Sequence, residues 1–284
     1  MTLATRFAPS PTGPLHLGHA YSALLAYGLA QAANGRFLLR IEDIDLSRAR
    51  PEWEAQIYSD LAWLGIEWEL PVMRQSKRQP AYDAALDKLW QRGVLYPCYC
   101  SRADIAAATA APQEGAPMLG PDGLIYPGTC RTDHPPTTVR PRDLPLRLNM
   151  AWACAQLDWP LGFTEEGSGT AQYVPITADE MQRGVGDIVL ARRDMGTSYH
   201  LSVVLDDAAQ HITHVVRGRD LLEATAIHVV VQALLDLPTP VYHHHRLIRD
   251  ETGKRLAKRD NARAIALMRS EGHSVKDIQS IIGL

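Results

Sequence analysis

The sequence predicts an α/β fold built on a parallel sheet, with a small insert in the middle of the chain. Segments typical of strands and helices alternate over the first 95 residues. A turn rich in Pro and Gly, residues 9–14, separates the first strand from the first helix, as in nucleotide-binding sheets of the Rossmann type. The alternation stops near residue 96 and returns after residue 160. Three of the four cysteines fall between residues 98 and 130, inside the interruption.

The first half of the predicted core covers residues 1–95. Its predicted strands are 2–8 and 36–41, and its predicted helices are 17–33, 51–64 and 77–92. Gly35 and Gly93 mark the ends of two of these helices, because glycine is favoured just after a helix. Pro51 suits the first turn of a helix, and the apolar side chains that follow it recur at helical spacing.

The second half of the core, residues 161–248, is expected to continue the parallel sheet. Its predicted strands are 187–191, 211–216 and 241–248, and its predicted helices are 199–206 and 221–235. A basic loop and two short helices, 262–270 and 274–282, are predicted within residues 249–284. The insert, residues 96–160, is rich in Pro, Gly and Ala and too short to bury much apolar core by itself.

Composition and charge are those of an ordinary globular protein. The chain has 284 residues, with 29 basic and 32 acidic side chains and a net charge of −3. A protein that binds nucleic acid over a large surface is usually basic, and we interpret the basic run 131–147 as a solvated face. No apolar stretch reaches the roughly 20 residues of a membrane helix, and no signal peptide precedes the first strand. We expect a cytoplasmic protein that acts as a monomer.

Two short motifs at opposite ends of the chain indicate nucleotide chemistry. His16 and His19 lie three residues apart, so they share a face at the start of the first predicted helix, where free N–H groups and the helix dipole favour phosphate. Gly18 leaves room for adenine or ribose. Lys258 lies in the basic loop and can close over the triphosphate. The alternative is a pair of ordinary histidines at a helix start.

Longer motifs resemble the class I glutamyl-tRNA synthetases. The matching segments are Arg6-Phe-Ala-Pro-Ser-Pro-Thr-Gly-Pro-Leu-His-Leu-Gly-His19, Arg40-Ile-Glu-Asp-Ile-Asp45, Tyr199-His-Leu-Ser-Val-Val-Leu-Asp-Asp207 and Val216-Arg-Gly-Arg-Asp-Leu-Leu222. The family's Lys-Met/Leu-Ser-Lys loop is represented here by Arg255-Leu-Ala-Lys258, which keeps the last lysine and lacks the serine. The resemblance implies a ligase with a Rossmann-type catalytic core that uses ATP with Mg²⁺ and in which His16, His19 and Lys258 stabilise the charge on the phosphates.

The length of the chain is similar to that of the glutamyl-Q tRNA(Asp) synthetases. Only about 25 residues follow the basic loop, whereas full glutamyl-tRNA synthetases continue into a helical region that reads the anticodon. Members of the shorter family activate L-glutamate and attach it to queuosine in the anticodon loop of tRNA(Asp). The resemblance therefore implies ATP, L-glutamate and tRNA(Asp) as partners. The alternatives are a glutamyl-tRNA synthetase core that charges a tRNA 3′ end and an inactive RNA-binding paralogue.

A candidate glutamate site follows from charge and matches the family's site. Glutamate has two carboxylates and one ammonium group. Arg6 and Arg217 can each hold a carboxylate in fork geometry, Glu42 suits the ammonium group, and Ser10 and Tyr199 can form hydrogen bonds. The alternative for either arginine is a buried ion pair with Glu42 or with an aspartate, and for Tyr199 it is a core aromatic ring.

The cysteine cluster predicts a structural zinc site. Zinc prefers four ligands in a tetrahedron, and thiolates are common among them. Cys98, Cys100 and Cys130 supply three. For the fourth, spacing alone favours His134, whereas the glutamyl-Q family pattern implies Tyr126, and we favour Tyr126. The alternative is a set of reduced core cysteines without a metal.

Overall fold

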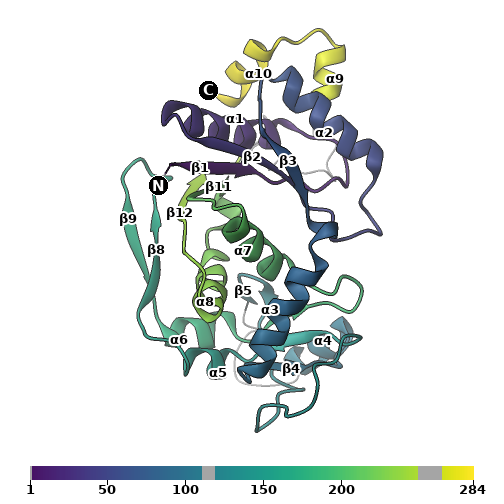
Figure 1. The fold of residues 1–284 in the computed structure, drawn as a ribbon, viewed down its shortest axis with the longest axis vertical. Coiled ribbons are helices and arrows are strands. Elements are labelled where there is room, and N and C mark those ends of the chain that lie inside the picture. Colours follow the sequence, from purple (N-terminus) through teal and green to yellow (C-terminus); the bar gives the residue numbers. More distant parts are fainter. Residues whose placement is uncertain (1, 111–118, 249–263) are drawn as a thin grey trace.

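A computed structural model describes residues 2–110, 119–248 and 264–284. It shows an elongated molecule in which the N-terminal sheet and the C-terminal helices lie at one end and the cysteine-bearing insert lies at the other (Figure 1). Within this described part, no helix combines the length and the apolar character that crossing a membrane requires.

The N-terminal sheet has three parallel strands in the order β1, β2, β3. They span Ala4–Phe7, Arg36–Ile41 and Glu69–Arg74. Helices α1, Leu17–Ala32, and α2, Pro51–Trp63, connect them. The predicted strands and helices of residues 1–64 are confirmed to within three residues. β3 was not predicted, because it is largely exposed and lacks a clear alternation of apolar side chains.

A second sheet continues the first. Its strands, in the order β11, β12, β8, β9, span His214–Gly218, Val241–His245, Leu161–Glu165 and Gln172–Ile176. β11 and β12 are parallel, and β9 returns antiparallel to β8. The backbone N–H of Thr213 donates to the carbonyl of Ala4 at 3.0 Å, so β11 lies beside β1. Helices α7, Tyr199–Ala209, and α8, Thr225–Leu235, flank this sheet.

A third sheet is antiparallel, and here the sequence prediction was wrong. The strand expected to resume the parallel pattern is β10, Ile188–Ala191. It pairs antiparallel with β7, Leu146–Leu148, which in turn pairs antiparallel with β4, Leu95–Pro97. Strand direction depends on the partner strand, which local composition does not reveal.

The remaining elements are short, apart from α3. They are α3 (Gln79–Gln91), α4 (Arg102–Ala110), β5 (Leu119–Gly120), β6 (Gly123–Leu124), α5 (Met150–Cys154), α6 (Ala178–Glu180), a π-helical turn (Met181–Val185), two 3₁₀ turns (Gln75–Lys77 and Arg219–Leu221), α9 (Ile265–Ser270) and α10 (Val275–Ile282). The interpretation of residues 131–147 as a solvated face fails at Arg140. This side chain is nearly buried and forms ion pairs with Asp83 and Asp87 of α3.

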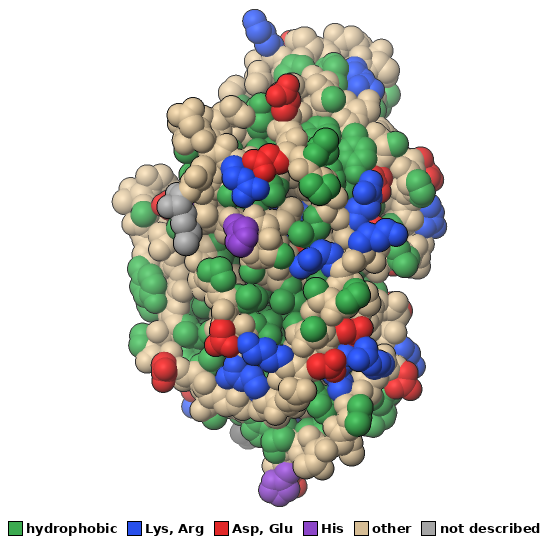
Figure 2. All heavy atoms as spheres, viewed as in Figure 1, with side chains coloured by type: hydrophobic (Ala, Val, Ile, Leu, Met, Phe, Trp, Pro, Cys, Tyr) green, Lys and Arg blue, Asp and Glu red, His purple; other side chains and the backbone are tan. Residues whose placement is uncertain are grey.

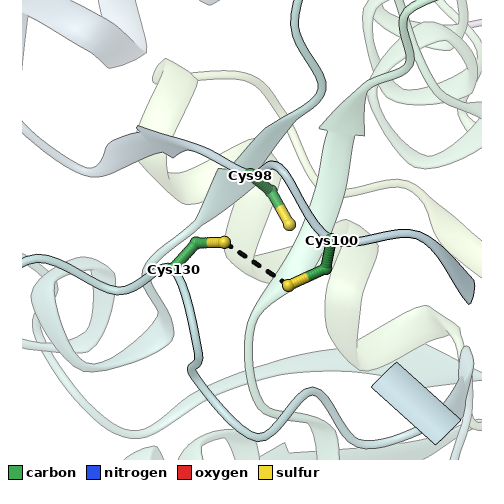
Figure 3. Close-up of side chains that lie close together, drawn as sticks. All are labelled: Cys98, Cys100 and Cys130. Carbon is green, nitrogen blue, oxygen red and sulfur yellow. Dashed lines mark hydrogen bonds between the residues drawn. The ribbon is translucent and has the colours of Figure 1, made fainter. Parts of the chain in front are cut away.

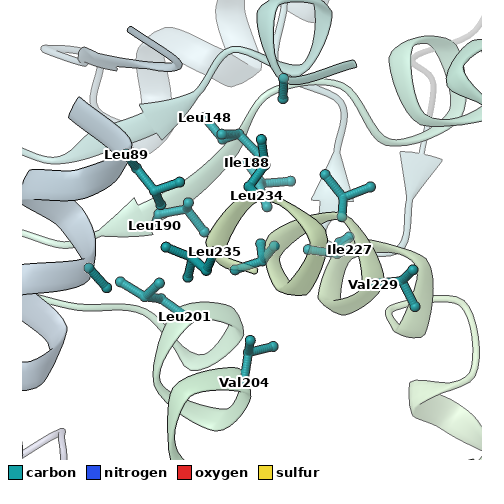
Figure 4. Packing of buried hydrophobic residues seen from close by; sticks show 14 of the residues in the cluster. Leu89, Leu148, Ile188, Leu190, Leu201, Val204, Ile227, Val229, Leu234 and Leu235 are labelled. Carbon is teal, nitrogen blue, oxygen red and sulfur yellow. The ribbon is translucent and has the colours of Figure 1, made fainter. Parts of the chain in front are cut away.

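Two hydrophobic cores lie on opposite faces of the joined sheets. The larger is formed mainly by α3, α7, α8 and the antiparallel sheet, and Figure 4 shows Leu89, Leu201 and Leu234 converging within it. The smaller surrounds the N-terminal sheet and the C-terminal helices. Val215 belongs to the larger core and Val216 to the smaller, because successive side chains of β11 point to opposite faces. Both faces are thus covered, and binding chemistry is left to the carboxyl ends of the strands.

Candidate active site

One cavity of about 680 Å³ opens at the carboxyl ends of β1, β2 and β11, beside the start of α1. Eight residues predicted to bind ATP or glutamate line it: Arg6, Ser10, His16, Gly18, His19, Glu42, Tyr199 and Arg217. The predicted phosphate-contacting residue Lys258 lies outside the described residues, as do Arg255 and Ala257. These eight residues come from positions 6 to 217 of the sequence and meet in one cavity.

The two histidines form the start of α1. His16 is the N-cap, and its Nδ1 accepts a hydrogen bond from the N–H of Gly18 at 3.1 Å. His19 Nδ1 accepts from the backbone N–H of His16 at 3.1 Å, and the two rings lie 3.8 Å apart. A Cβ at position 18 would lie 3.0 Å from the ring of His16, so any larger residue there would require that ring to shift. Because both Nδ1 atoms accept, each neutral imidazole has its proton on Nε2, which makes Nε2 a donor.

The C-terminal part of the chain returns to this helix start. Ala264 forms an antiparallel bridge with His16, and the N–H of Ile265 donates to the carbonyl of Leu15 at 2.9 Å. Ile248 lines the same cavity. The described residues on both sides of segment 249–263 are therefore anchored at this cavity.

Arg6 is held by a carboxylate. Its Nε donates to Asp207 Oδ1 at 2.9 Å, and its Nη2 donates to Oδ2 at 3.4 Å. Arg40, fully buried, donates to the same Oδ1 at 2.6 Å and to Glu42 Oε1 at 3.2 Å. Burial opposes ionisation of Asp207, yet the Arg40 and Arg6 guanidinium groups lower its pKa below the usual value. The fork of Arg6 is thus occupied by an aspartate, as one of the two sequence interpretations expected.

Arg217 has a different environment. Its Nε donates to His244 Nε2 at 3.1 Å, and its Nη1 donates to His228 Nδ1 at 3.0 Å. Its Nη2 donates to the Thr225 hydroxyl at 2.8 Å and to the Leu221 carbonyl at 3.2 Å. Among the described residues, no carboxylate contacts this guanidinium group. One of its five N–H groups therefore has no partner in the described part of the chain, and the guanidinium charge is not neutralised by direct contact.

Tyr199 and Glu42 are two further polar residues in the lining of the cavity. Tyr199 is the first residue of α7, and its ring lies edge-on to those of His200 and His228. Burial raises the pKa of Tyr199, which keeps the phenol protonated. Burial also raises the pKa of Glu42, although Arg40 and Arg6 partly offset it. By contrast, Asp43 accepts hydrogen bonds from Ser76 and has a structural role.

The cysteine cluster lies at the other end of the molecule, and Figure 3 shows its three thiols facing one another. The sulfur atoms of Cys98, Cys100 and Cys130 lie within 4.8 Å of one another. The hydroxyl of Tyr126 is 3.6 Å from the sulfur of Cys98 and 3.4 Å from that of Cys100, and it accepts from the Cys130 N–H at 2.8 Å. A tetrahedral zinc site would separate sulfur and oxygen ligands by about 3.5 Å. The residues therefore fit a zinc ion.

His134 is not part of this cluster. Its side chain is exposed, and no histidine nitrogen in the described chain joins the three sulfurs within 4.8 Å. The cluster is fixed to the core through Asp187, whose carboxylate accepts from Tyr96 at 2.6 Å and from Arg131 at 3.0 Å. Arg147 lies over the ring of Tyr126, with 3.8 Å between the guanidinium carbon and the ring centroid. The geometry places Tyr126, and not His134, beside the thiols.

Sequence reasoning missed the residues that hold the two site arginines. Arg40 and Asp207 lie inside the family motifs, and the available signal was that Arg40 stands two residues before Glu42 and that Asp207 directly follows Asp206. His228, His244 and Glu165 come from three different elements, and only the run His243-His244-His245 was visible in the sequence. Alternation along β12 turns His244 away from its two neighbours.

Comparison with known proteins identifies the class. The family model "tRNA synthetases class I (E and Q), catalytic domain" matches residues 2–118 and 171–282. A solved glutamate–tRNA synthetase from Elizabethkingia anophelis superposes with a TM-score of 0.72 at 26% identity, over 96% of this chain and 54% of that one. A methionyl-tRNA synthetase from Mycobacterium tuberculosis, at 12% identity and a TM-score of 0.60, shares the fold alone. The chain is thus a class I tRNA synthetase catalytic domain, and it spans about half the length of the solved glutamate–tRNA synthetase.

Relatives narrow the family further. A curated glutamyl-Q tRNA(Asp) synthetase from Rhodobacter capsulatus is 62% identical over 286 residues, which cover 99% of this chain and 100% of that protein. Another from Geobacter sulfurreducens is 42% identical over 92% of this chain and 77% of its own length. The chain belongs to the glutamyl-Q tRNA(Asp) synthetase family and is a ligase.

Proposed function

We propose that the protein activates L-glutamate with ATP and transfers it to queuosine in the anticodon loop of tRNA(Asp). The observation that supports this most directly is the shared cavity of His16, His19, Arg6, Glu42 and Arg217. A nucleotide at the start of α1 and an amino acid beside the two arginines would occupy one continuous space. The printed names of the relatives support the choice of acceptor.

The first step joins glutamate to AMP. The α-carboxylate of glutamate attacks the α-phosphorus of ATP, and pyrophosphate leaves. His16 and His19 Nε2 are donors already placed at the N-terminus of α1, so they stabilise developing phosphate charge without reorganisation. Lys258 is proposed to add a positive charge on the same phosphates. Mg²⁺ bound with ATP would neutralise part of the triphosphate charge. Positioning and electrostatics suffice, and no protein nucleophile is required.

Glutamate recognition rests on the two arginines and Glu42. Arg217 offers the side-chain carboxylate a charge that is not neutralised, and Arg6 has N–H groups beyond those engaged by Asp207. Glu42 accepts the ammonium group, whose charge would favour the ionised carboxylate in spite of its burial. Ser10 and Tyr199 supply hydrogen bonds at the cavity wall. Glutamine, which lacks the second negative charge, would bind more weakly.

The second step delivers glutamate to RNA. A hydroxyl of queuosine attacks the activated carbonyl, and AMP leaves. Figure 2 shows that, on the face seen in Figure 1, Lys and Arg side chains are interspersed with Asp and Glu and do not form a continuous basic surface. Together with the net charge of −3, this pattern suits a small RNA contact such as one anticodon loop. We propose that the enzyme acts as a cytoplasmic monomer.

A structural zinc ion is proposed to stabilise the fold of the insert, with Cys98, Cys100, Cys130 and Tyr126 as its ligands. The test is the zinc content of purified variants measured by atomic absorption. Cys100→Ser is expected to abolish binding and Tyr126→Phe to weaken it, whereas His134→Ala is the matched control and keeps full zinc. Loss of zinc from the His134→Ala protein alone would reverse the assignment of the fourth ligand.

Two assays test the function. Glutamate-dependent exchange of labelled pyrophosphate into ATP, without tRNA, tests activation. Transfer of labelled glutamate is then measured on tRNA(Asp) with and without queuosine, and on tRNA(Glu). We expect exchange with glutamate and labelling only of queuosine-containing tRNA(Asp). Labelling of tRNA(Glu) at its 3′ end would indicate a glutamyl-tRNA synthetase core, and absence of exchange would indicate an inactive paralogue.

A further inference from the structure

Each histidine that accepts a hydrogen bond from Arg217 is hydrogen-bonded through its other ring nitrogen to a further side chain. His244 accepts from Arg217 through Nε2, and its Nδ1 is hydrogen-bonded to Glu165 Oε2. The other oxygen of Glu165 accepts from the backbone N–H groups of His244 at 3.0 Å and Gly167 at 2.7 Å. We call the series Arg217–His244–Glu165 the short relay.

A second series starts at the other side of the guanidinium group. His228 accepts from Arg217 through Nδ1, and its Nε2 lies 3.1 Å from His200 Nδ1. His200 Nε2 in turn lies 3.4 Å from Asp122 Oδ1, in the turn between β5 and β6. We call the series Arg217–His228–His200–Asp122 the long relay. It connects the glutamate cavity to the insert.

The protonation of these histidines follows from the donors that face them. An arginine has only donors, so the nitrogens that face Arg217, His244 Nε2 and His228 Nδ1, are unprotonated. The remaining protons lie on His244 Nδ1 and His228 Nε2, directed to Glu165 and His200. Both rings are therefore neutral. Burial lowers the pKa of His228 well below its usual value and that of His244 to about 4, which agrees with this geometry.

We propose that His244 with Glu165, and His228 with His200 and Asp122, are positioning residues that hold Arg217 for the substrate carboxylate. The proposal rests on the proposed function, because that function supplies the carboxylate. A neutral imidazole orients the guanidinium group through a hydrogen bond but, unlike a carboxylate, leaves its charge to the ligand. The carboxylates stand at the far ends of the relays, Glu165 one histidine away from Arg217 and Asp122 two histidines away. There they fix which ring nitrogen of each neighbouring histidine has the proton.

The long relay gives His200 and Asp122 a role in glutamate binding from outside the cavity wall. His200 is nearly buried, whereas the Asp122 side chain is 45% exposed. The short relay borders a second cavity of about 580 Å³, which Glu165 and His244 line.

Paired variants at residue 228 test the proposal by kinetics. His228→Leu removes the acceptor, whereas His228→Gln keeps one in its amide oxygen. We expect His228→Leu to raise the KM for glutamate in pyrophosphate exchange roughly ten- to hundredfold, because a buried N–H of Arg217 loses its acceptor. The KM for ATP is expected to stay within about twofold, and His228→Gln is expected to recover most of the loss. Equal KM values for glutamate in all three proteins, or parallel rises for glutamate and ATP, would overturn the proposal.

A spectroscopic test does not depend on activity. Nitrogen-15 NMR of histidine-labelled wild-type protein reports which ring nitrogen has the proton, and His228→Gln and His244→Gln assign the signals. We expect an unprotonated Nδ1 on His228 and an unprotonated Nε2 on His244 at neutral pH. A proton on either of these nitrogens contradicts the relays whatever the assays show. The predicted tautomers in a protein without glutamate-dependent exchange would instead refute the proposed function and leave Arg217 positioned for another anion.

Discussion

Arg6 and Arg217 lie in the same cavity, are about equally buried and are held in opposite ways. Arg6 shares Asp207 with Arg40, and Glu42 closes the cluster on the other side of Arg40. Arg217 is surrounded by imidazoles, a hydroxyl and a carbonyl. The first cluster pairs its positive charges with negative ones inside the protein. The second leaves one positive charge for a ligand.

The difference separates a cluster that also holds the fold together from a cluster that keeps its positive charge for binding. A buried carboxylate shared by two guanidinium groups ties β1, β2 and α7 together, and removing it leaves two charges unpaired. Neutral acceptors cost less to bury than ions and keep the guanidinium in place. Both clusters stand at the carboxyl ends of strands, so the fold alone does not determine which arginine keeps an unneutralised charge for the ligand.

The largest expected effect is on the Arg6 cluster. Asp207→Asn keeps the volume and removes the charge shared by Arg6 and Arg40. We expect the free energy of unfolding to fall by about 3–5 kcal/mol, measured by urea denaturation. Asp179→Asn, in the exposed pair with Arg183, is the control and should change it by less than about 0.5 kcal/mol. A small effect of Asp207→Asn would make the two clusters energetically alike.

The second-largest expected effect is on the use of glutamate and concerns the Arg217 cluster. Arg217→Lys keeps the charge and loses the planar set of donors that the histidines hold. We expect glutamate-dependent exchange, as kcat/KM, to fall about a hundredfold. Arg219→Lys, two residues along the chain and exposed, should leave it unchanged. If the Arg217→Lys enzyme kept normal activity, the Arg217 cluster would have no ligand role.

Lowering the pH is expected to remove the stability contributions of the two clusters over different pH ranges. The pKa of folded His244 is about 4 and the ordinary value is 6.5, so between these values the unfolded chain binds a proton that the folded chain does not. Stability is therefore greatest above pH 6.5 and falls as the pH drops towards 4, by up to about 1.4 kcal/mol per pH unit. Asp207, with its lowered pKa, contributes stability above the usual value of 3.8 that is lost only at lower pH.

Urea denaturation from pH 8 to pH 4 measures this slope. His244→Gln is expected to reduce it, whereas substitution of the exposed His134 by Gln should not. An unchanged slope in the His244→Gln protein would mean that other groups account for the loss.

The smallest expected effect comes from giving Arg217 an internal carboxylate partner, as Arg6 already has. Thr225→Asp places a carboxylate beside Arg217 Nη2, where the hydroxyl now accepts at 2.8 Å. An internal carboxylate competes with the substrate, so we expect the KM for glutamate to rise about tenfold. Thr225→Ser is the matched control, and melting temperatures check the fold. Unchanged glutamate affinity in the Thr225→Asp protein would show that Arg217 does not need an unneutralised charge.

The sequence predicted the helices and strands that position the site better than it predicted the contacts between side chains within the site. The apolar spacing after Pro51 and the turn rich in Pro and Gly before His16 are local signals, and both helices form where expected. The β8–β9 hairpin and the direction of β10 depend on partners distant in the chain. The same holds for the histidine relays, since His200, His228 and His244 meet only after three elements pack together.

The most direct test is a crystal structure of the enzyme with a non-hydrolysable analogue of glutamyl-adenylate. The glutamyl carboxylate is expected at about 3 Å from the Arg217 guanidinium, with the phosphate mimic beside His16 and His19. Both histidine relays should be intact in that complex. A glutamyl carboxylate bound away from Arg217, or an adenylate bound away from the start of α1, would contradict the account.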